Sequence, residues 1–251
     1  LGDTIEKIAF EKAGIIRPNI PVVFAGQQSL PQAIRDKVTE TQASLYALNR
    51  DYFYQLNDDG QTWSFASSGT TLKLPVGQLA LDNISTAVAA VLISGLEISQ
   101  TSIAAGIQQA RLQGRFEVRK IQNKTVIFDA GHNPHGVEFL LKQLQKFLKY
   151  HTQYTEVIAV FSMLADKDIA SVTDLLKTTV NDWFIATLDV PRAAPMQQLQ
   201  DVLQGQQVHT FDHIQQAFET AVQQCHHHQL ILVCGSFHTL EAVWESLEQC
   251  Q

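Results

Sequence analysis

The chain has 251 residues, a length that suits one large domain or two of ordinary size. Hydrophobic residues make up 45% of it and charged residues 17%, which is the composition of a globular protein with a full core. The formal charge is −7, and this argues against the basic surface that non-specific nucleic-acid binding needs. We therefore expect no nucleic-acid partner, although a few arginines and helix N-termini would suffice for one phosphate group.

The apolar runs and the cysteines predict a cytoplasmic protein with no membrane partner. The longest purely apolar stretch, 87–93, is far too short to span a bilayer, and no signal peptide is visible. Cys225, Cys234 and Cys250 include no CxxC pair, so we expect no zinc knuckle, and sparse thiols suit a reducing compartment. Because the chain begins at Leu1 rather than at Met, we expect further residues upstream.

The first part of the chain predicts a mixed α/β segment. Its helices are expected over 4–13, 30–42, 78–93 and 99–109. Its strands are expected over 22–25, 52–56, 62–66 and 71–74. Turn sequences rich in Asp, Ser and Gly separate the last three strands, which is the pattern of a β-meander.

From Gly114 onward, strands and helices alternate. The strands are expected over 118–121, 125–128, 157–161, 183–187, 208–211 and 230–234. The helices are expected over 134–149, 168–179, 195–204, 212–225 and 238–249. This alternation predicts an α/β fold with a Rossmann-like, mostly parallel sheet and helices on both faces. We place the domain boundary near residue 113, so the predicted domains are 1–113 and 114–251.

Polar loops follow four of the predicted strands, and ligands of open parallel sheets bind at the carboxyl ends of the strands. These loops cover 129–135, 162–168, 189–194 and 235–238. Each is ordinary alone, because strand-to-helix loops need polar caps, and Asp168 is expected to be such a helix N-cap. Four of them at one edge favour a binding cleft there.

The loop Asp129-Ala130-Gly131-His132-Asn133-Pro134 is the most specific of the four. Asn133 is expected to cap a helix that begins at Pro134. Asp129 ends a buried strand, where its carboxylate needs a partner such as a ribose hydroxyl or a cation. His132 is expected to face the cleft, where it would donate to a phosphate or hold an aspartate. Spacing alone leaves a capped helix with a satisfied histidine equally open.

Lys12 is an anomaly of the first predicted helix. Ile5, Ile8, Ala9 and Lys12 recur at helical spacing, so Lys12 lies on the apolar face. A buried ammonium is costly unless it is paired or modified. The alternative, which periodicity favours, is a lysine whose ammonium reaches solvent from the last turn, near the negative end of the helix.

Three further features have both a bland and a functional interpretation. Arg115 follows Gly114 at the expected hinge and is either a surface residue or a ligand for phosphate. Asn83, a weak helix former, lies in an otherwise small and apolar helix, where a functional contact is a second interpretation. The run 226–228 of three histidines falls in a predicted loop, and we interpret it as a solvated turn rather than a metal site.

These stretches together resemble the folylpolyglutamate synthase/dihydrofolate synthase branch of the Mur ligase superfamily. The resemblance spans nearly the whole chain, and the Glu-Lys-Ala-Gly-Ile and Asp-x-x-His-Asn-Pro pair is highly specific. The matching stretches, in the family's order, are 1–9, 11–15, 78–83, 114–117, 129–135, 166–168, 192–193 and 235–236.

The resemblance implies an ATP-dependent ligase. In such enzymes ATP phosphorylates a substrate carboxylate, and an amine then attacks the acyl phosphate. Here the carboxylate would belong to dihydropteroate or to a folate glutamyl tail, and the amine would be L-glutamate. The cofactors would be ATP and Mg²⁺, and the family leads us to expect a monomer.

The resemblance also implies roles for single residues. Lys12 would be carbamylated and would help to organise the magnesium ion indirectly, which would account for its place on the apolar face. Asn83 would contact the adenine, and Arg115 the phosphates. Asp129 would lie at the ribose, and His132 would support the ATP site at the domain interface. Arg192 and Ser236 would bind substrate. Lys12, Arg115 and His132 would be the catalytic residues.

The chain departs from the family pattern in two ways. The glycine-rich phosphate loop and the magnesium-binding Glu and His should lie upstream, so we expect this fragment alone to be inactive. The loop also reads Asp-Ala-Gly-His, where the family has Gly-Ala or Val-Ala, a swap of small residues.

Two alternatives remain open from the sequence. A cell-wall Mur ligase would use the same chemistry on a nucleotide-linked muropeptide, although the Glu-Lys-Ala-Gly-Ile stretch and Glu117 favour the folate branch. The isolated chain could also act as a non-catalytic Rossmann-like module.

Overall fold

The computed structural model describes residues 4–26 and 29–248, so Cys250 and the first three residues of the family-like stretch lie outside the described residues. The chain divides into two compact units, Leu1–Ala110 and Arg111–Gln251. Among the described residues, no helix is both long and apolar enough to cross a membrane.

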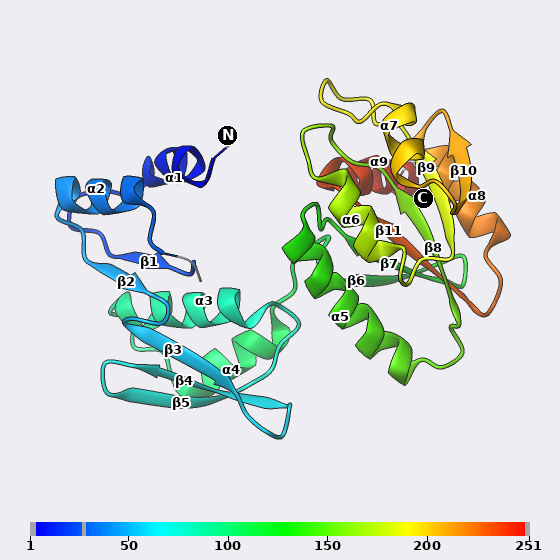
Figure 1. The fold of residues 1–251 in the computed structure, drawn as a ribbon. Helices are drawn as coiled ribbons and strands as arrows, with labels where there is room; N and C mark the ends of the chain where they lie inside the picture. The colour runs from blue at the N-terminus through cyan, green and yellow to red at the C-terminus, as the bar shows by residue number, and fades with distance from the viewer. Residues whose placement is uncertain (1–3, 27–28, 249–251) are drawn as a thin grey trace. The chain divides into compact units, whose positions relative to one another are not determined.

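The first unit contains a small parallel pair of strands and a separate antiparallel meander (Figure 1). Its helices are α1 (Ile5–Ala13), α2 (Gln32–Thr41), α3 (Leu81–Ile93) and α4 (Gln100–Gln109). Its strands are β1 (Val22–Phe24), β2 (Leu45–Ala47), β3 (Tyr52–Leu56), β4 (Thr62–Ser67) and β5 (Thr70–Pro75). The order β3-β4-β5 confirms the predicted β-meander.

The meander buries one face against α3 and α4. Tyr52, Trp63, Phe65 and Leu74 alternate along the strands and are fully buried, as period-two patterning requires. They pack with four helical residues, Ile84, Val88, Ile103 and Ile107. A second, smaller cluster joins α1 to α2 through Ala9, Ala13, Ile16, Ile34 and Ala43.

The second unit is built on a sheet of order β10-β9-β8-β11-β7-β6, parallel except for β6 (Figure 1). Its strands are β6 (Glu117–Ile121), β7 (Lys124–Asp129), β8 (Glu156–Phe161), β9 (Asp182–Ala186), β10 (Gln207–Phe211) and β11 (Gln229–Cys234). Its helices are α5 (Pro134–Tyr150), α6 (Ile169–Leu176), α7 (Met196–Val202), α8 (Ile214–Gln224) and α9 (Phe237–Glu248).

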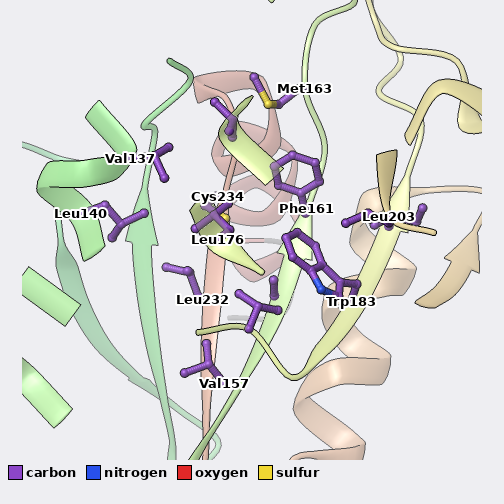
Figure 2. Close-up of a cluster of buried hydrophobic side chains, with 14 of the residues drawn as sticks. Val137, Leu140, Val157, Phe161, Met163, Leu176, Trp183, Leu203, Leu232 and Cys234 are labelled. Atoms are coloured by element: carbon purple, nitrogen blue, oxygen red, sulfur yellow. The ribbon is translucent and has the colours of Figure 1, made fainter. Parts of the chain in front are cut away.

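Helices cover both faces of this sheet, which confirms the predicted α/β fold. Alternate strand residues such as Phe161, Trp183 and Leu232 face α5, α6 and α7 (Figure 2). The residues between them, such as Val160, Phe184 and Val233, face α8 and α9. The β7, β8 and β11 strands are buried on both faces, which explains their nearly continuous apolar sequences.

Candidate functional site

The site begins where three central strands end side by side. In the register of the sheet, Asp129 of β7 lies opposite Cys234 of β11, which lies opposite Phe161 of β8. The last strand of the chain is thus inserted between two earlier ones. The polar loops after β7, β8, β9 and β11 consequently leave the same edge, as the sequence predicts, because these strands are parallel.

Gly235 allows the loops after β8 and β11 to meet. Its φ is +109°, and a Cβ there would lie 2.2 Å from the Ser162 carbonyl oxygen. Any other residue would clash with this backbone, so glycine is required by contact as well as by conformation. The close approach brings Ser236 and the start of α9 next to the end of β8.

Ser236 is committed to the start of α9. Its buried hydroxyl accepts a 3.0 Å hydrogen bond from the Thr239 backbone N–H and lies 2.8 Å from the Thr239 hydroxyl. The Thr239 hydroxyl in turn donates to the Ser162 carbonyl at 2.8 Å. Ser236 therefore acts as a helix cap in this structure. Its expected contact with substrate remains a prediction.

The turn Gly114-Arg115-Phe116-Glu117 is tied to the same edge by its own backbone. The Glu117 carboxylate accepts from the Gly114 N–H at 2.9 Å, and the Gly114 carbonyl accepts from the Ala130 N–H at 2.9 Å. Gly114 has a φ of +67°, and a Cβ there would lie 2.7 Å from Leu240 Cδ2. Glycine therefore lets the turn lie directly against α9.

Asp129 holds this turn from the other side. One carboxylate oxygen accepts from the Phe116 N–H at 2.9 Å, and the other accepts from the Gly131 N–H at 2.8 Å. The side chain is buried, and burial raises the pKa of the Asp129 carboxyl, while these two N–H groups and the charge of Arg115 oppose the rise. The partners that the sequence left open are backbone amides, and a ribose contact remains a prediction.

Arg115 is half-buried and stands over an aromatic ring. Its guanidinium carbon lies 4.9 Å from the centroid of the Phe237 ring. Among the described residues, this guanidinium donates no hydrogen bond. Its N–H groups therefore remain available for an anion, and a guanidinium suits a phosphate well.

The loop after β7 begins α5 as the sequence predicts. Asn133 caps the helix by accepting from the Gly136 N–H at 2.8 Å, and Pro134 is its first residue. His132 is half-buried, and its Nδ1 lies 3.0 Å from the Ala130 carbonyl oxygen. A carbonyl only accepts, so Nδ1 carries the proton and Nε2 of the neutral ring is an acceptor. Only the protonated ring would donate to a phosphate through Nε2.

Arg192 lies on the loop after β9 and shares one carboxylate with a second cation. Its Nη1 is 3.3 Å from Asp166 Oδ2, to which Lys167 Nζ also lies at 3.0 Å. The hydrogen bond from Lys167 is the main cause that lowers the pKa of Asp166. The backbone joins the two loops, because the Ala165 N–H donates to the Arg192 carbonyl at 2.8 Å. Arg192 is exposed and therefore accessible to a substrate carboxylate.

Lys12 and Asn83 both lie in the first unit and are exposed. Ile5 and Ile8 are exposed as well, whereas Ala9 of the same predicted face is buried. The exposed Lys12 agrees with the alternative that periodicity favours, a lysine whose ammonium reaches solvent. The helix buries Ala9 and Ala13 against α2. Lys12 lines an open hollow of about 350 Å³ together with apolar residues such as Ile16 and Phe24. Asn83 lies in the first turn of α3.

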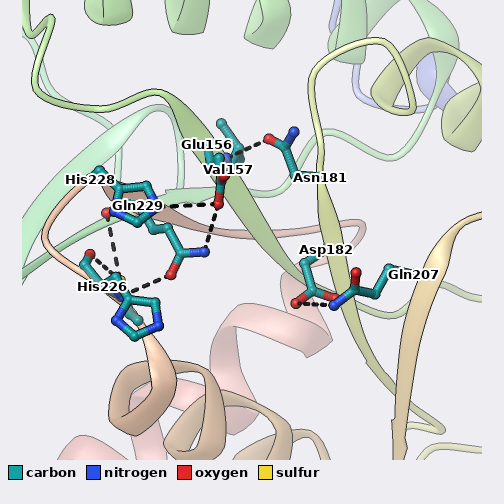
Figure 3. Close-up of polar contacts among 9 residues, drawn as sticks. Glu156, Val157, Asn181, Asp182, Gln207, His226, His228 and Gln229 are labelled. Atoms are coloured by element: carbon teal, nitrogen blue, oxygen red, sulfur yellow. Dashed lines mark hydrogen bonds and ion pairs between the residues drawn. The ribbon is translucent and has the colours of Figure 1, made fainter.

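No group of three or more His, Cys, Asp or Glu side chains within the described ranges could hold a metal ion. The histidine run at the amino end of β11 is part of a structural network, which supports the interpretation as a turn (Figure 3). Gln229 accepts from the His226 N–H and donates to Glu156, both at 2.8 Å. The second side chain near that carboxylate is His228, whose Nε2 lies 3.5 Å from it.

Phe237 lies in the predicted loop 235–238, but the sequence did not single it out as a site residue. It follows Ser236 directly and has an exposed fraction of 47%, which is high for a large aromatic side chain. An aromatic residue at the first position of a helix has no special signature. Only the fold reveals that its ring lies under Arg115.

Comparison with known proteins identifies the class of domain that the second unit resembles. Residues 114–237 match the family model described as Mur ligase, glutamate ligase domain. Over almost its whole length the chain is also similar to curated bifunctional folate synthases. It is 37% identical to dihydrofolate synthase/folylpolyglutamate synthase of Escherichia coli K12, over 99% of this chain and 57% of that protein.

Solved structures agree with this relationship. A structure of E. coli FolC in complex with DHPP and ADP matches with a TM-score of 0.82 and 37% identity, over 99% of this chain and 58% of that one. A bifunctional folylpolyglutamate synthase/dihydrofolate synthase with Mn, AMPPNP and L-glutamate bound matches with a TM-score of 0.82 and 34% identity, over the same shares. The chain thus spans little more than half the length of these relatives.

Proposed function

We propose that the protein containing this chain uses ATP to join L-glutamate to dihydropteroate, to the γ-carboxyl of a folate polyglutamate, or to both. ATP would phosphorylate the acceptor carboxylate, and the glutamate amine would then displace phosphate from the acyl phosphate. Homology over 99% of the chain to folate synthases supports this proposal. The structural observation that carries it is the Arg115 guanidinium, presented at the carboxyl edge of the sheet with its N–H groups available.

The residues of the second unit fit the binding of a nucleotide phosphate. Arg115 would bind phosphate oxygens and offset the charge that develops during transfer. Asp129 would fix the turn that carries Arg115, through the Phe116 N–H. His132 would accept a hydrogen bond through Nε2 from a substrate hydroxyl or amine, or would bind phosphate once protonated.

The substrate and first-unit roles belong to the same proposal. Arg192 would exchange its contact with Asp166 for a carboxylate of the substrate, and Ser236 would help to line that subsite. Asn83 would contact the adenine. Lys12 would act as a carbamylated, anionic side chain, for which its exposure gives access to carbon dioxide and water.

Magnesium does not fit the described residues by themselves. They contain no cluster of three acidic, histidine or cysteine ligands. The unmodified side chain of Lys12 is a cation and offers no oxygen ligand to magnesium. We therefore assign no step of the mechanism to a metal ion held by these residues. The carbamylated form of Lys12 would supply one anionic group, to act with ligands from elsewhere in the full-length protein.

We assign residues 1–113 to the C-terminal part of a central ATP-binding domain and residues 114–251 to the glutamate ligase domain. The compact units that meet between residues 110 and 111, and the family match that begins at residue 114, support this division. We further propose a cytoplasmic monomer that acts on small molecules without a nucleic-acid or membrane partner. The net charge of −7 is consistent with the absence of a nucleic-acid partner.

Glutamate-dependent release of ADP by the full-length protein tests the proposed function. We expect turnover when ATP, L-glutamate and either dihydropteroate or a reduced folate are all present. Replacing Arg115 by Ala should raise the activation free energy by about 2–4 kcal/mol, as for the loss of one transition-state donor. The matched control is Arg50→Ala, which removes an exposed arginine paired with Asp51 in the first unit and should leave turnover unchanged.

Turnover with a UDP-linked muropeptide in place of the folate substrates would identify a cell-wall ligase and overturn the folate assignment. An unchanged rate for Arg115→Ala would remove the phosphate role of this residue. ATP hydrolysis that does not depend on glutamate would contradict the ligase reaction itself.

A further inference from the structure

Phe237 contacts the Arg115 guanidinium through the face of its ring. The guanidinium carbon is 4.9 Å from the ring centroid, and within the described part of the chain no hydrogen bond accompanies this contact. Other arginines of the same protein are held through their N–H groups. Arg119 donates to Glu117 at 2.7 Å, and Arg50 donates to Asp51 at 2.8 Å.

Whether an arginine is held by a carboxylate or by an aromatic ring decides whether its N–H groups can bind an anion. A carboxylate partner would occupy the N–H groups and neutralise the charge before the anion arrives. The face of an aromatic ring attracts the cation through its quadrupole and leaves the N–H edge of the guanidinium open. A ring partner therefore restricts the side chain without competing with phosphate.

Contacts between the backbone segments that carry Phe237 and Arg115 place these two residues close together. Phe237 is the first residue of α9, which is fixed by the Ser236 cap and by the Thr239 bond to Ser162. The turn that carries Arg115 lies against the same helix, since a Cβ on Gly114 would be 3.4 Å from Phe237 Cε1. Neither side chain needs a mobile segment to reach the other.

We propose that Phe237 is a positioning residue for Arg115, whose guanidinium it holds by its ring face in an orientation that leaves the N–H groups open to a phosphate oxyanion. This inference rests on the proposed function of Arg115. It adds to that function the residue that limits the motion of the arginine, and it explains why an aromatic side chain remains exposed at the start of α9.

Phe237→Leu in the full-length protein tests the proposal, because leucine keeps apolar bulk and removes the π face. We expect the kcat/KM for ATP to fall about threefold to thirtyfold, with the KM for the folate substrate unchanged. Phe237→Tyr should restore activity to within about twofold, since tyrosine has an equivalent ring face. Phe53→Leu is the matched control, because Phe53 is exposed to 48% on β3 and should tolerate the change without loss.

A double-mutant cycle separates positioning from a general structural effect. In an Arg115→Ala background, Phe237→Leu should cause no further loss of activity, because the group it positions is gone. The melting temperatures of all variants should be recorded alongside. A full additional loss in that background, or wild-type kcat/KM for Phe237→Leu in the presence of Arg115, would overturn the proposal. If Arg115→Ala itself leaves activity unchanged, the proposed function of Arg115 fails instead.

Discussion

Asp129 explains how a carboxylate can end a buried strand in this protein. Both oxygens accept hydrogen bonds from backbone N–H groups, one from Phe116 and one from Gly131. Burial disfavours the charged form, and these bonds together with the charge of Arg115 offset that cost. The carboxylate therefore fixes the geometry of the turn that carries Arg115.

The proposed role of Lys12 depends on a chemical modification of its side chain, carbamylation. As an amine at the exposed end of α1 it is an ordinary lysine of a last helical turn. As a carbamate it would be an anion and would act with the nucleotide's metal ion. The amine form carries a positive charge and the carbamate form a negative charge, so substitution of Lys12 can distinguish them.

We expect Lys12→Ala to abolish glutamate-dependent ADP release by the full-length protein, and a short-chain carboxylic acid to restore part of it. The added acid would replace the carboxylate of the carbamate, which no amine could do. Rates measured with increasing acetate or propionate provide the test. Lys37→Ala, which removes a half-buried lysine paired with Glu40, is the control and should need no rescue. Full activity of unrescued Lys12→Ala would refute the role.

At the scale of elements, the contact between the Gly114–Glu117 turn and α9 is the feature that shapes the site. Gly114 lies against Leu240 and Trp244 with a positive φ, so both its conformation and its lack of a side chain are used. Gly205 has a similar φ of +80°, but a Cβ there would meet no described atom within 4 Å. A comparison of substitutions at Gly114 and Gly205 therefore separates the effect of backbone strain from the effect of close contact.

We expect Gly114→Ala to lower the free energy of unfolding by about 1–3 kcal/mol more than Gly205→Ala, because the first adds overpacking to the same backbone strain. Chemical denaturation of both variants measures the difference. Gly114→Ala should also reduce kcat, since the displaced turn carries Arg115. Equal destabilisation by the two substitutions would mean that α9 yields freely and that the turn is not fixed by this contact.

The elements were predictable where periodicity is strong and long. The β-meander and the alternating strands and helices of the second unit are confirmed. The β2 strand was not predicted, because its sequence Leu-Tyr-Ala lacks the pair of β-branched residues that marks the equally short β1. The α3 helix begins at Leu81 rather than at 78, because its N-cap, Ala80, offers no side-chain signal.

The site was predictable as a set of loops but not as a set of contacts. Parallel strands fix the common edge, so Asp129, Arg192 and Ser236 could be placed on it from the sequence. The Phe116 bond to Asp129 and the Thr239 bond to Ser162 join residues that are 13 and 77 positions apart in the chain, and no local pattern encodes them. The exposure of Ile5 and Ile8 was also hidden, because a helical stripe does not reveal what covers it.

At the scale of the whole molecule, the chain supplies two units that carry different proposed parts of one reaction. Lys12 and Asn83 belong to the first unit, and Arg115, Asp129, His132, Arg192 and Ser236 belong to the second. The relatives are longer, with this chain covering 57% of the E. coli protein. The activity is therefore a property that we assign to the full-length protein.

The fate of a carboxylate oxygen tests the central claim most directly. A folate substrate labelled with ¹⁸O in the reacting carboxylate should be incubated with the full-length protein, ATP and L-glutamate, and the released phosphate analysed by mass spectrometry. An acyl phosphate would pass one carboxylate oxygen to phosphate as the amide bond forms, so we expect one ¹⁸O in each phosphate released. Unlabelled phosphate accompanying formation of the glutamyl product would contradict the acyl-phosphate mechanism, and absence of the product would contradict the ligase assignment.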